Sequence, residues 1–162
     1  MNTPTPNPTT ASLATPLPPF VILLVEDEPA DAHLVKAAIR ENHILAELSH
    51  VVDGCEALEY LRRKGPRFAN APRPDLILLD LNMPRMDGRK CLAALKEDPD
   101  LRTIPVVVLT TSDVERDVFA SYNSGAAGFI TKPMDVVQFM AAIRDLGIYW
   151  FALVRLSEKP KP

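Results

Sequence analysis

The segment LILLD, at residues 76–80, places four consecutive apolar residues directly before an aspartate. An uninterrupted apolar run of this kind is typical of a strand buried on both faces, as in the centre of a parallel sheet. Three further strand-like runs, at 20–25, 106–109 and 128–131, also end directly before a polar or charged residue. The sequence therefore predicts several buried strands whose ends carry chemically useful side chains.

Helical patterns separate these runs. Apolar residues at helical spacing follow the first run from Pro29 onward, and similar patterns occupy 57–61 and 91–95. Ser112 opens a capping-box pattern at the start of another predicted helix. A last helix is expected to begin near Pro133.

Alternating strands and helices indicate an α/β fold in which helices cover both faces of a five-stranded parallel sheet. We expect the strands at 20–25, 46–51, 75–79, 105–109 and 127–131. The second strand is more polar than the others and fits an edge. Right-handed crossovers then favour a flavodoxin-like sheet of order 2-1-3-4-5 with five flanking helices.

Composition limits the classes of partner. The chain has 162 residues, of which 47% are hydrophobic, and its formal net charge is −3. No basic block suggests nucleic acid as a partner, and the apolar runs are too short to cross a membrane. Cys55 and Cys91 stand alone, which is typical of a cytoplasmic protein with reduced thiols.

Three regions are predicted along the chain. Residues 1–19 are rich in proline and are expected to form a disordered leader. Residues 20–146 form the α/β domain, and residues 147–162 extend its last helix. This extension carries apolar side chains that either fold back on the same subunit or, as we favour, meet a second copy. The candidate dimer residues are Tyr149, Trp150, Phe151 and Val154.

The strand ends predict a shared site, because the carboxyl ends of parallel strands meet at one edge of a sheet. Glu26 and Asp27 follow the first strand, Asp80 the third, Thr110 the fourth and Lys132 the fifth. Singly, each of them has an ordinary explanation as a cap, turn or surface residue. Their joint placement favours a functional site.

The side chains at the strand ends suit a divalent cation and a phosphoryl group. Three neighbouring carboxylates repel and raise one another's pKa values, and a hard cation such as Mg²⁺ relieves the repulsion. The carboxylate of Asp80 is then a candidate nucleophile toward phosphorus. The cation, Lys132 and Thr110 would meet the charge on the phosphoryl oxygens. Asp53, after the edge strand, is left out of the set.

Four segments carry a resemblance to a known family. They are LLVEDE at 23–28, DLNMPRMDG at 80–88, VVLTTS at 107–112 and GFITKP at 128–133. Together they resemble the receiver domains of two-component response regulators, and in particular stand-alone receivers of the chemotaxis type. The resemblance spans about residues 20–146 and preserves the order and spacing of the motifs.

The resemblance implies roles for the metal ligands. Asp80 would be the phosphoacceptor and would contact Mg²⁺. Asp27 would bind the cation directly, and Glu26 would act mainly through a water molecule. The backbone carbonyl of Asn82 would complete the protein ligands.

It also implies a switch. Lys132 would pair with the acceptor carboxylate and then with the phosphate, while Thr110 would bind a phosphate oxygen. Phe129 matches an aromatic switch position at which the family often has tyrosine. Phosphorylation would then reshape the face formed by the fourth helix, the fifth strand and the fifth helix.

The implied function is that of a stand-alone response regulator whose phosphodonor is a sensor histidine kinase. It would not be an enzyme beyond its own phosphotransfer and slow autodephosphorylation. The apolar tail and the loop from Gly65 to Pro74 resemble single-domain regulators associated with bacterial phytochromes, which implies a phytochrome-type kinase.

Alternatives to an output switch remain open. The protein could be a phosphorelay intermediate or a phosphate sink. An aspartyl-phosphate phosphatase is disfavoured, because Asn82 stands where a second aspartate would serve as acid and base. A flavin carrier is disfavoured too, since the acidic residues after the first strand would repel a phosphate.

Overall fold

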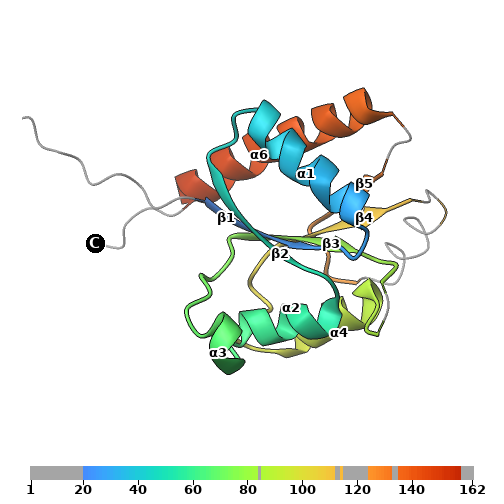
Figure 1. Cartoon of the computed structure of the whole chain (residues 1–162). Helices are drawn as coiled ribbons and strands as arrows, with labels where there is room; N and C mark the ends of the chain where they lie inside the picture. The colour runs from blue at the N-terminus through green and yellow to red at the C-terminus, as the bar shows by residue number, and fades with distance from the viewer. Residues whose placement is uncertain (1–19, 84, 112–113, 115–123, 133–134, 158–162) are drawn as a thin grey trace, which may run out of the picture.

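A five-stranded parallel sheet forms the centre of the fold (Figure 1). The computed structural model describes residues 20–157 except 84, 112–113, 115–123 and 133–134. The sheet order is β2-β1-β3-β4-β5, which confirms the predicted topology. Because all neighbouring strands are parallel, every strand ends at the same edge of the sheet. The strands are β1 (Phe20–Val25), β2 (Ala46–Val51), β3 (Leu76–Asp80), β4 (Val106–Thr110) and β5 (Gly128–Thr131).

Helices cover the sheet on both faces (Figure 1). One face carries α1 (Pro29–Glu41) and the long α6 (Val136–Ser157), which pack against each other. The opposite face carries α2 (Gly54–Leu61), α3 (Gly65–Phe68) and α4 (Gly88–Glu97). No helix of the described chain has the length and apolarity needed to cross a membrane.

The core lies on both sides of the central strands. All residues of β1, β3 and β4 are buried, whereas β2 at the edge is mostly half-buried. Alternate side chains point to opposite faces, so Leu23 and Ile77 pack toward α2 and α4 while Leu24 and Leu78 pack toward α1 and α6. The continuous apolar runs follow from this burial on two faces.

The predicted loop from Gly65 to Pro74 contains a short helix, α3, that the sequence analysis did not anticipate. Its proline in the first turn has a backbone angle suited to helix, which favours the turn. Phe68 at its end is buried and makes an edge-to-face contact with Tyr60, with ring centroids 5.5 Å apart. Burial of this ring, rather than helix length, stabilises the segment.

Some boundaries differ from the predicted ones. β3, β4 and β5 each begin one residue later than expected, and β3 includes Asp80, which pairs with Leu109 of β4. The helix predicted from Ser112 lies largely outside the described residues. The last helix is described from Val136, and Pro133, near which it was expected to begin, is also outside the description.

Candidate functional site

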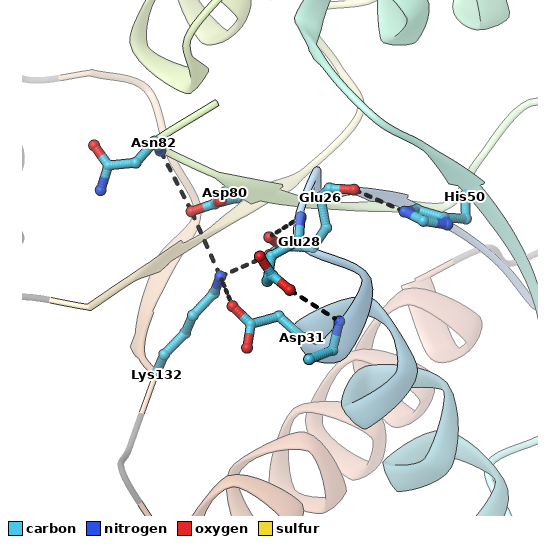
Figure 2. A network of polar contacts seen from close by, with 8 residues as sticks. Glu26, Glu28, Asp31, His50, Asp80, Asn82 and Lys132 are labelled. Carbon is cyan, nitrogen blue, oxygen red and sulfur yellow. Dashed lines mark hydrogen bonds and ion pairs between the residues drawn. The ribbon is translucent and has the colours of Figure 1, made fainter. Parts of the chain in front are cut away.

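The carboxyl edge of the sheet brings together side chains from three strand ends (Figure 2). Glu26 follows β1, Asp80 is the last residue of β3, and Lys132 follows β5. The register places them there, because Leu79 pairs with Val25 and Asp80 pairs with Leu109. The predicted gathering of these side chains is therefore observed.

An acidic cluster occupies the centre of this edge. Glu26, Asp27 and Asp80 each offer a carboxylate oxygen, and these oxygens lie within 4.8 Å of one another. Glu26 is 0% exposed and Asp80 is 4% exposed, while Asp27 is half-buried. Hard oxygen ligands that share a small volume are the donor set that Mg²⁺ or Mn²⁺ prefers. The residues present thus fit a divalent cation.

Burial raises the pKa values of two of the carboxylates, those of Glu26 and Asp80. Desolvation raises the pKa of Glu26 to about 7, with a further contribution from the charge of Asp80 and a partial offset from Lys132. Desolvation also raises the pKa of Asp80, although the charge of Lys132 opposes the shift. A bound cation would favour the ionised form of both groups.

Lys132 supplies the positive charge of the site. Its Nζ lies 2.6 Å from Glu26 Oε2, 2.8 Å from Asp31 Oδ2 and 3.7 Å from Asp80 Oδ1. Burial alone lowers the pKa of Lys132, but hydrogen bonds to Asp31 and Glu26 outweigh it and the net shift is upward. Lys132 is therefore an ammonium held at the centre of three carboxylates.

Backbone hydrogen bonds fix the acidic side chains from both flanks. Glu26 Oε1 accepts from the N–H of Glu28 at 3.2 Å, and the Glu28 side chain in turn caps α1. Asp80 Oδ1 accepts from the N–H of Asn82 at 3.3 Å. Each carboxylate is thus oriented by the turn that follows its own strand, which limits its freedom before any ligand arrives.

The loop after β3 is held close to the end of the strand at Gly88. A Cβ at this position would lie 2.2 Å from the carbonyl oxygen of Asp80 and 2.7 Å from Cα of Leu81. The Gly88 N–H donates to the carbonyl of Leu81 at 2.9 Å. Glycine is required here by close approach of the backbone, which lets the loop return directly beside Asp80.

The other predicted site residues take the following places. Thr110 is 0% exposed at the end of β4, and its carbonyl accepts from the N–H of Lys132 at 2.6 Å. Phe129 in β5 is partly buried against the core under α2 and α4. Asn82 is exposed, and its side chain extends away from the carboxylates (Figure 2).

The candidate dimer residues lie in α6 beyond the part whose side chains are described. The helix itself continues to Ser157. The four candidate residues are Tyr149, Trp150, Phe151 and Val154. Their side chains lie outside the described part of the structure, so the dimer contact stays a prediction.

Sequence reasoning missed Asp31. This residue lies in the first turn of α1, where an acidic side chain is common because it complements the helix dipole. Its spacing of four residues from Asp27 places it beside the predicted site, and that was the available signal. Only the structure shows that it contacts Lys132, which is 101 positions away in the sequence.

Asp53, left out of the site by its position after the edge strand, has a structural role. It is 2% exposed and caps α2 by accepting from the N–H of Glu56 at 2.8 Å. Its other carboxylate oxygen accepts from Arg85 Nε at 2.6 Å. Asp53 therefore connects the start of α2 to the loop that follows β3.

Comparison with known proteins gives a family match and similar curated proteins. Residues 22–144 match the family described as Response regulator receiver domain. Response regulator Rcp1 of Synechocystis sp. is 45% identical over 139 residues, which cover 86% of this chain and 94% of Rcp1. Probable methanogenesis regulatory protein FilR2 of Methanothrix harundinacea is 36% identical, with 82% of this chain and 84% of FilR2 covered.

Solved structures give the same picture. The phosphorylated cyanobacterial phytochrome response regulator RcpA is 44% identical, with a TM-score of 0.77 over 84% of this chain and 96% of RcpA. The Mn²⁺-bound form of Rcp1 has a TM-score of 0.73 at 45% identity, over 82% of this chain and 94% of Rcp1. The bacteriophytochrome response regulator AtBRR has a TM-score of 0.70 at 41% identity, over 82% and 96% of the two chains.

Proposed function

This chain belongs to the response regulator receiver family, and we propose that it acts as a single-domain response regulator phosphorylated on Asp80. The observation that carries the proposal is the position of Asp80, buried at the carboxyl edge among two further carboxylates and one ammonium. Similarity over nearly the whole length of Rcp1 supports the single-domain form.

The proposed cofactor is Mg²⁺. Glu26, Asp27 and Asp80 would hold it together with the backbone carbonyl of Asn82, and Glu26 would act through a water molecule. The acidic cluster supports this proposal, as does the Mn²⁺-bound form of the related Rcp1. When bound, the cation would neutralise negative charge on the carboxylates and on the phosphoryl oxygens.

The proposed reaction is a phosphoryl transfer from a phosphohistidine of a sensor histidine kinase. A carboxylate oxygen of Asp80 forms a bond to phosphorus as the bond from phosphorus to the imidazole nitrogen breaks, and the imidazole leaves. Lys132 meets the charge of the transferred group, because its ammonium is already 3.7 Å from Asp80 Oδ1. Thr110, the last residue of β4, donates a hydrogen bond from its hydroxyl to a phosphoryl oxygen.

The proposed signal is a change at the face that β5 presents. Thr110 moves toward the new phosphoryl oxygens, and the room that it leaves accepts the ring of Phe129. Both residues lie on adjacent paired strands, β4 and β5, which supports their coupling. The added charge therefore selects between two packing arrangements of this face together with α6.

The proposed partner is a phytochrome-type histidine kinase, supported by the similarity to phytochrome response regulators named RcpA and AtBRR. A second copy of the chain is a further proposed partner, through the C-terminal part of α6. Transfer onward to a histidine domain, or drainage of phosphate from a kinase, remain alternative uses of the same acceptor. The cytoplasm is the proposed location.

Phosphotransfer from purified kinases tests this function. Autophosphorylated kinases of the phytochrome class, labelled with ³²P, are mixed with the wild-type protein and with Asp80→Asn in Mg²⁺ or in chelator. We expect rapid transfer only to wild type and only with the divalent cation. Transfer to Asp80→Asn at the wild-type rate would exclude Asp80 as the acceptor. Transfer from unrelated kinases alone would exclude the phytochrome partner and leave the receiver function in place.

A further inference from the structure

Asp31 makes a close contact that the receiver site as proposed above does not use. Its Oδ2 lies 2.8 Å from Nζ of Lys132, nearly as close as Oε2 of Glu26 at 2.6 Å. Figure 2 shows the ammonium with Glu26, Asp31 and Asp80 around it. Lys132 therefore has one carboxylate partner that lies outside the acidic cluster.

The position of Asp31 differs from that of the cluster in its access to water. Its side chain is 38% exposed, whereas the side chain of Glu26 is 0% exposed. It stands in the first turn of α1, behind the side-chain cap made by Glu28, where the helix dipole favours negative charge. Water therefore reaches the carboxylate of Asp31, whereas the carboxylate of Glu26 depends on protein partners alone.

The carboxylate of Glu26 has two competing partners, Lys132 and the proposed cation. It hydrogen-bonds Lys132, and it is one of the three carboxylates that fit a divalent cation. If Glu26 turns to the cation, the ammonium loses its shortest contact and the described carboxylates still beside it are Asp31 and Asp80. Pairing with Asp80 would then compete with the cation for the same oxygens.

We propose that Asp31 is a positioning residue that gives Lys132 an anchor outside the acidic cluster and so leaves Glu26 and Asp80 available to the cation. This inference rests on the proposed metal site. Without this anchor, the ammonium of Lys132 pairs with the carboxylates of Glu26 and Asp80 alone and competes with the metal for them. Asp31 touches no proposed metal ligand in this arrangement and acts through Lys132 alone.

Mn²⁺ binding tests the anchor directly. The free Mn²⁺ signal is followed by electron paramagnetic resonance as metal-free protein is added, for wild type, Asp31→Asn and Asp31→Glu. The matched control is Asp145→Asn, an exposed helical aspartate of α6 whose contact is with its neighbour Arg144. We expect Asp31→Asn to weaken binding by about three- to tenfold, the range of a coupled charge pair, and Asp145→Asn to leave it unchanged. Asp31→Glu restores part of the loss.

A double-mutant cycle separates the anchor from the mere loss of one negative charge. In a Lys132→Met background, the effect of Asp31→Asn on Mn²⁺ affinity should disappear, because no ammonium remains to be held. A simple charge effect would persist at the same size. Nitrogen-15 spectra of the Lys132 ammonium in the metal-free single variant give a second measure, with faster proton exchange expected in Asp31→Asn.

Each outcome distinguishes the two proposals. Equal Mn²⁺ affinities for wild type, Asp31→Asn and Asp145→Asn, or an unchanged Lys132 ammonium signal, would overturn the anchor while the metal site stands. An effect of equal size with and without Lys132 would also overturn it. Failure of the wild-type protein to bind Mn²⁺ would overturn the metal site and the anchor together.

Discussion

At the scale of single residues, burial controls the chemistry of the carboxyl edge. Glu26 has no access to water, and its pKa is raised to about 7 by desolvation and by the nearby charge of Asp80. The ordinary glutamate value is 4.5, so the folded metal-free protein retains this proton over a pH range in which the unfolded chain has lost it. A cation must displace the proton in order to bind.

The first prediction concerns the pH dependence of metal binding. Because the ionised fraction of Glu26 grows as the pH rises through about 7, the apparent affinity for Mn²⁺ should increase between pH 6 and pH 8. Titration calorimetry in buffers of different ionisation enthalpy would also detect proton release at the lower pH. In Glu26→Gln the affinity should be weaker and nearly independent of pH in this range. A wild-type affinity that is flat from pH 6 to pH 8 would contradict the assignment.

The same desolvation makes the ionised carboxylate of Asp80 unfavourable for folding when no cation is bound. Burial raises the pKa of Asp80 even in the presence of Lys132, so folding disfavours its ionised form. Stability therefore falls as pH rises above the ordinary aspartate value, and a neutral residue of similar shape removes this cost.

The second prediction follows for Asp80→Asn. Its free energy of unfolding in chelator at pH 8 should exceed that of wild type by about 1 kcal/mol, the order expected when an unfavourable buried charge is neutralised. Urea unfolding followed by circular dichroism measures this, with Asp145→Asn as the control for a charge change at an exposed site. A less stable Asp80→Asn would mean that the ion pair with Lys132 outweighs the desolvation.

Residue by residue, the sequence predicted the positions of the residues at the strand ends, whereas their roles stay predictions. Asp80, Thr110 and Lys132 could be placed because each lies at the end of a recognisable strand. Asp31 could not, since an acidic residue in the first turn of a helix is explained equally well by the helix dipole. Its contact depends on the side-chain path of Lys132 across the edge of the sheet, which no local pattern encodes.

At the scale of elements, the loop between β3 and α4 is tied down at two points. Asp53 joins it to the start of α2 through Arg85, and the N–H of Gly54 donates to the carbonyl of Met86 at 3.3 Å. Arg85 has a backbone φ of 62°, in the left-handed region that favours glycine, so its ion pair helps to hold a strained turn. The loop thereby keeps the strand end at Asp80 in a fixed direction.

The third prediction separates the two contributions of Asp53. Asp53→Ala removes both the cap of α2 and the pairing with Arg85, and it should lower the free energy of unfolding by about 2 kcal/mol. Asp53→Asn can still cap the helix and should cost less. Arg85→Gly removes the ion pair, but glycine suits the positive φ. Its decrease in the free energy of unfolding should therefore be the smallest of the three. Chemical denaturation gives the ranking, and a reversed order would show that the ion pair dominates.

The fourth prediction concerns Gly88. A methyl group there would lie 2.2 Å from the Asp80 carbonyl oxygen, so the backbone of the loop has to move. Gly88→Ala should lower the free energy of unfolding by about 1–3 kcal/mol, the typical cost of overpacking, and should weaken Mn²⁺ binding as Asp80 is displaced. Gly65→Ala is an instructive comparison, because nothing lies within 4 Å of its added Cβ and only its positive φ opposes the change. Equal metal affinity in Gly88→Ala and wild type would show that the close approach does not orient Asp80.

Predictability at this scale depended on burial. β1, β3 and β4 are apolar throughout because helices cover both of their faces, and this made them recognisable. α3 was missed because four residues are too few to show helical periodicity. Its stability comes from the contact of Phe68 with Tyr60, which the sequence alone does not reveal.

At the scale of the whole molecule, the sheet order brings the strand ends together. β1 and β3 are neighbours at the centre, and β4 and β5 follow on one side, so Glu26, Asp80 and Lys132 meet although they are far apart in sequence. The order was predictable because the polar second strand fits an edge and the crossovers have one hand. The kinase partner was predicted only through the family resemblance, since partner choice depends on surface side chains beyond this edge.

Chemical mapping of the phosphoryl group tests the central claim most directly. Wild-type protein is treated with phosphoramidate, with and without Mg²⁺, reduced with borohydride, and digested for mass spectrometry. We predict that reduction converts residue 80 alone to homoserine, and only in the sample that contained Mg²⁺. Modification of another carboxylate instead of Asp80, or equal modification in the presence of chelator, would contradict the account.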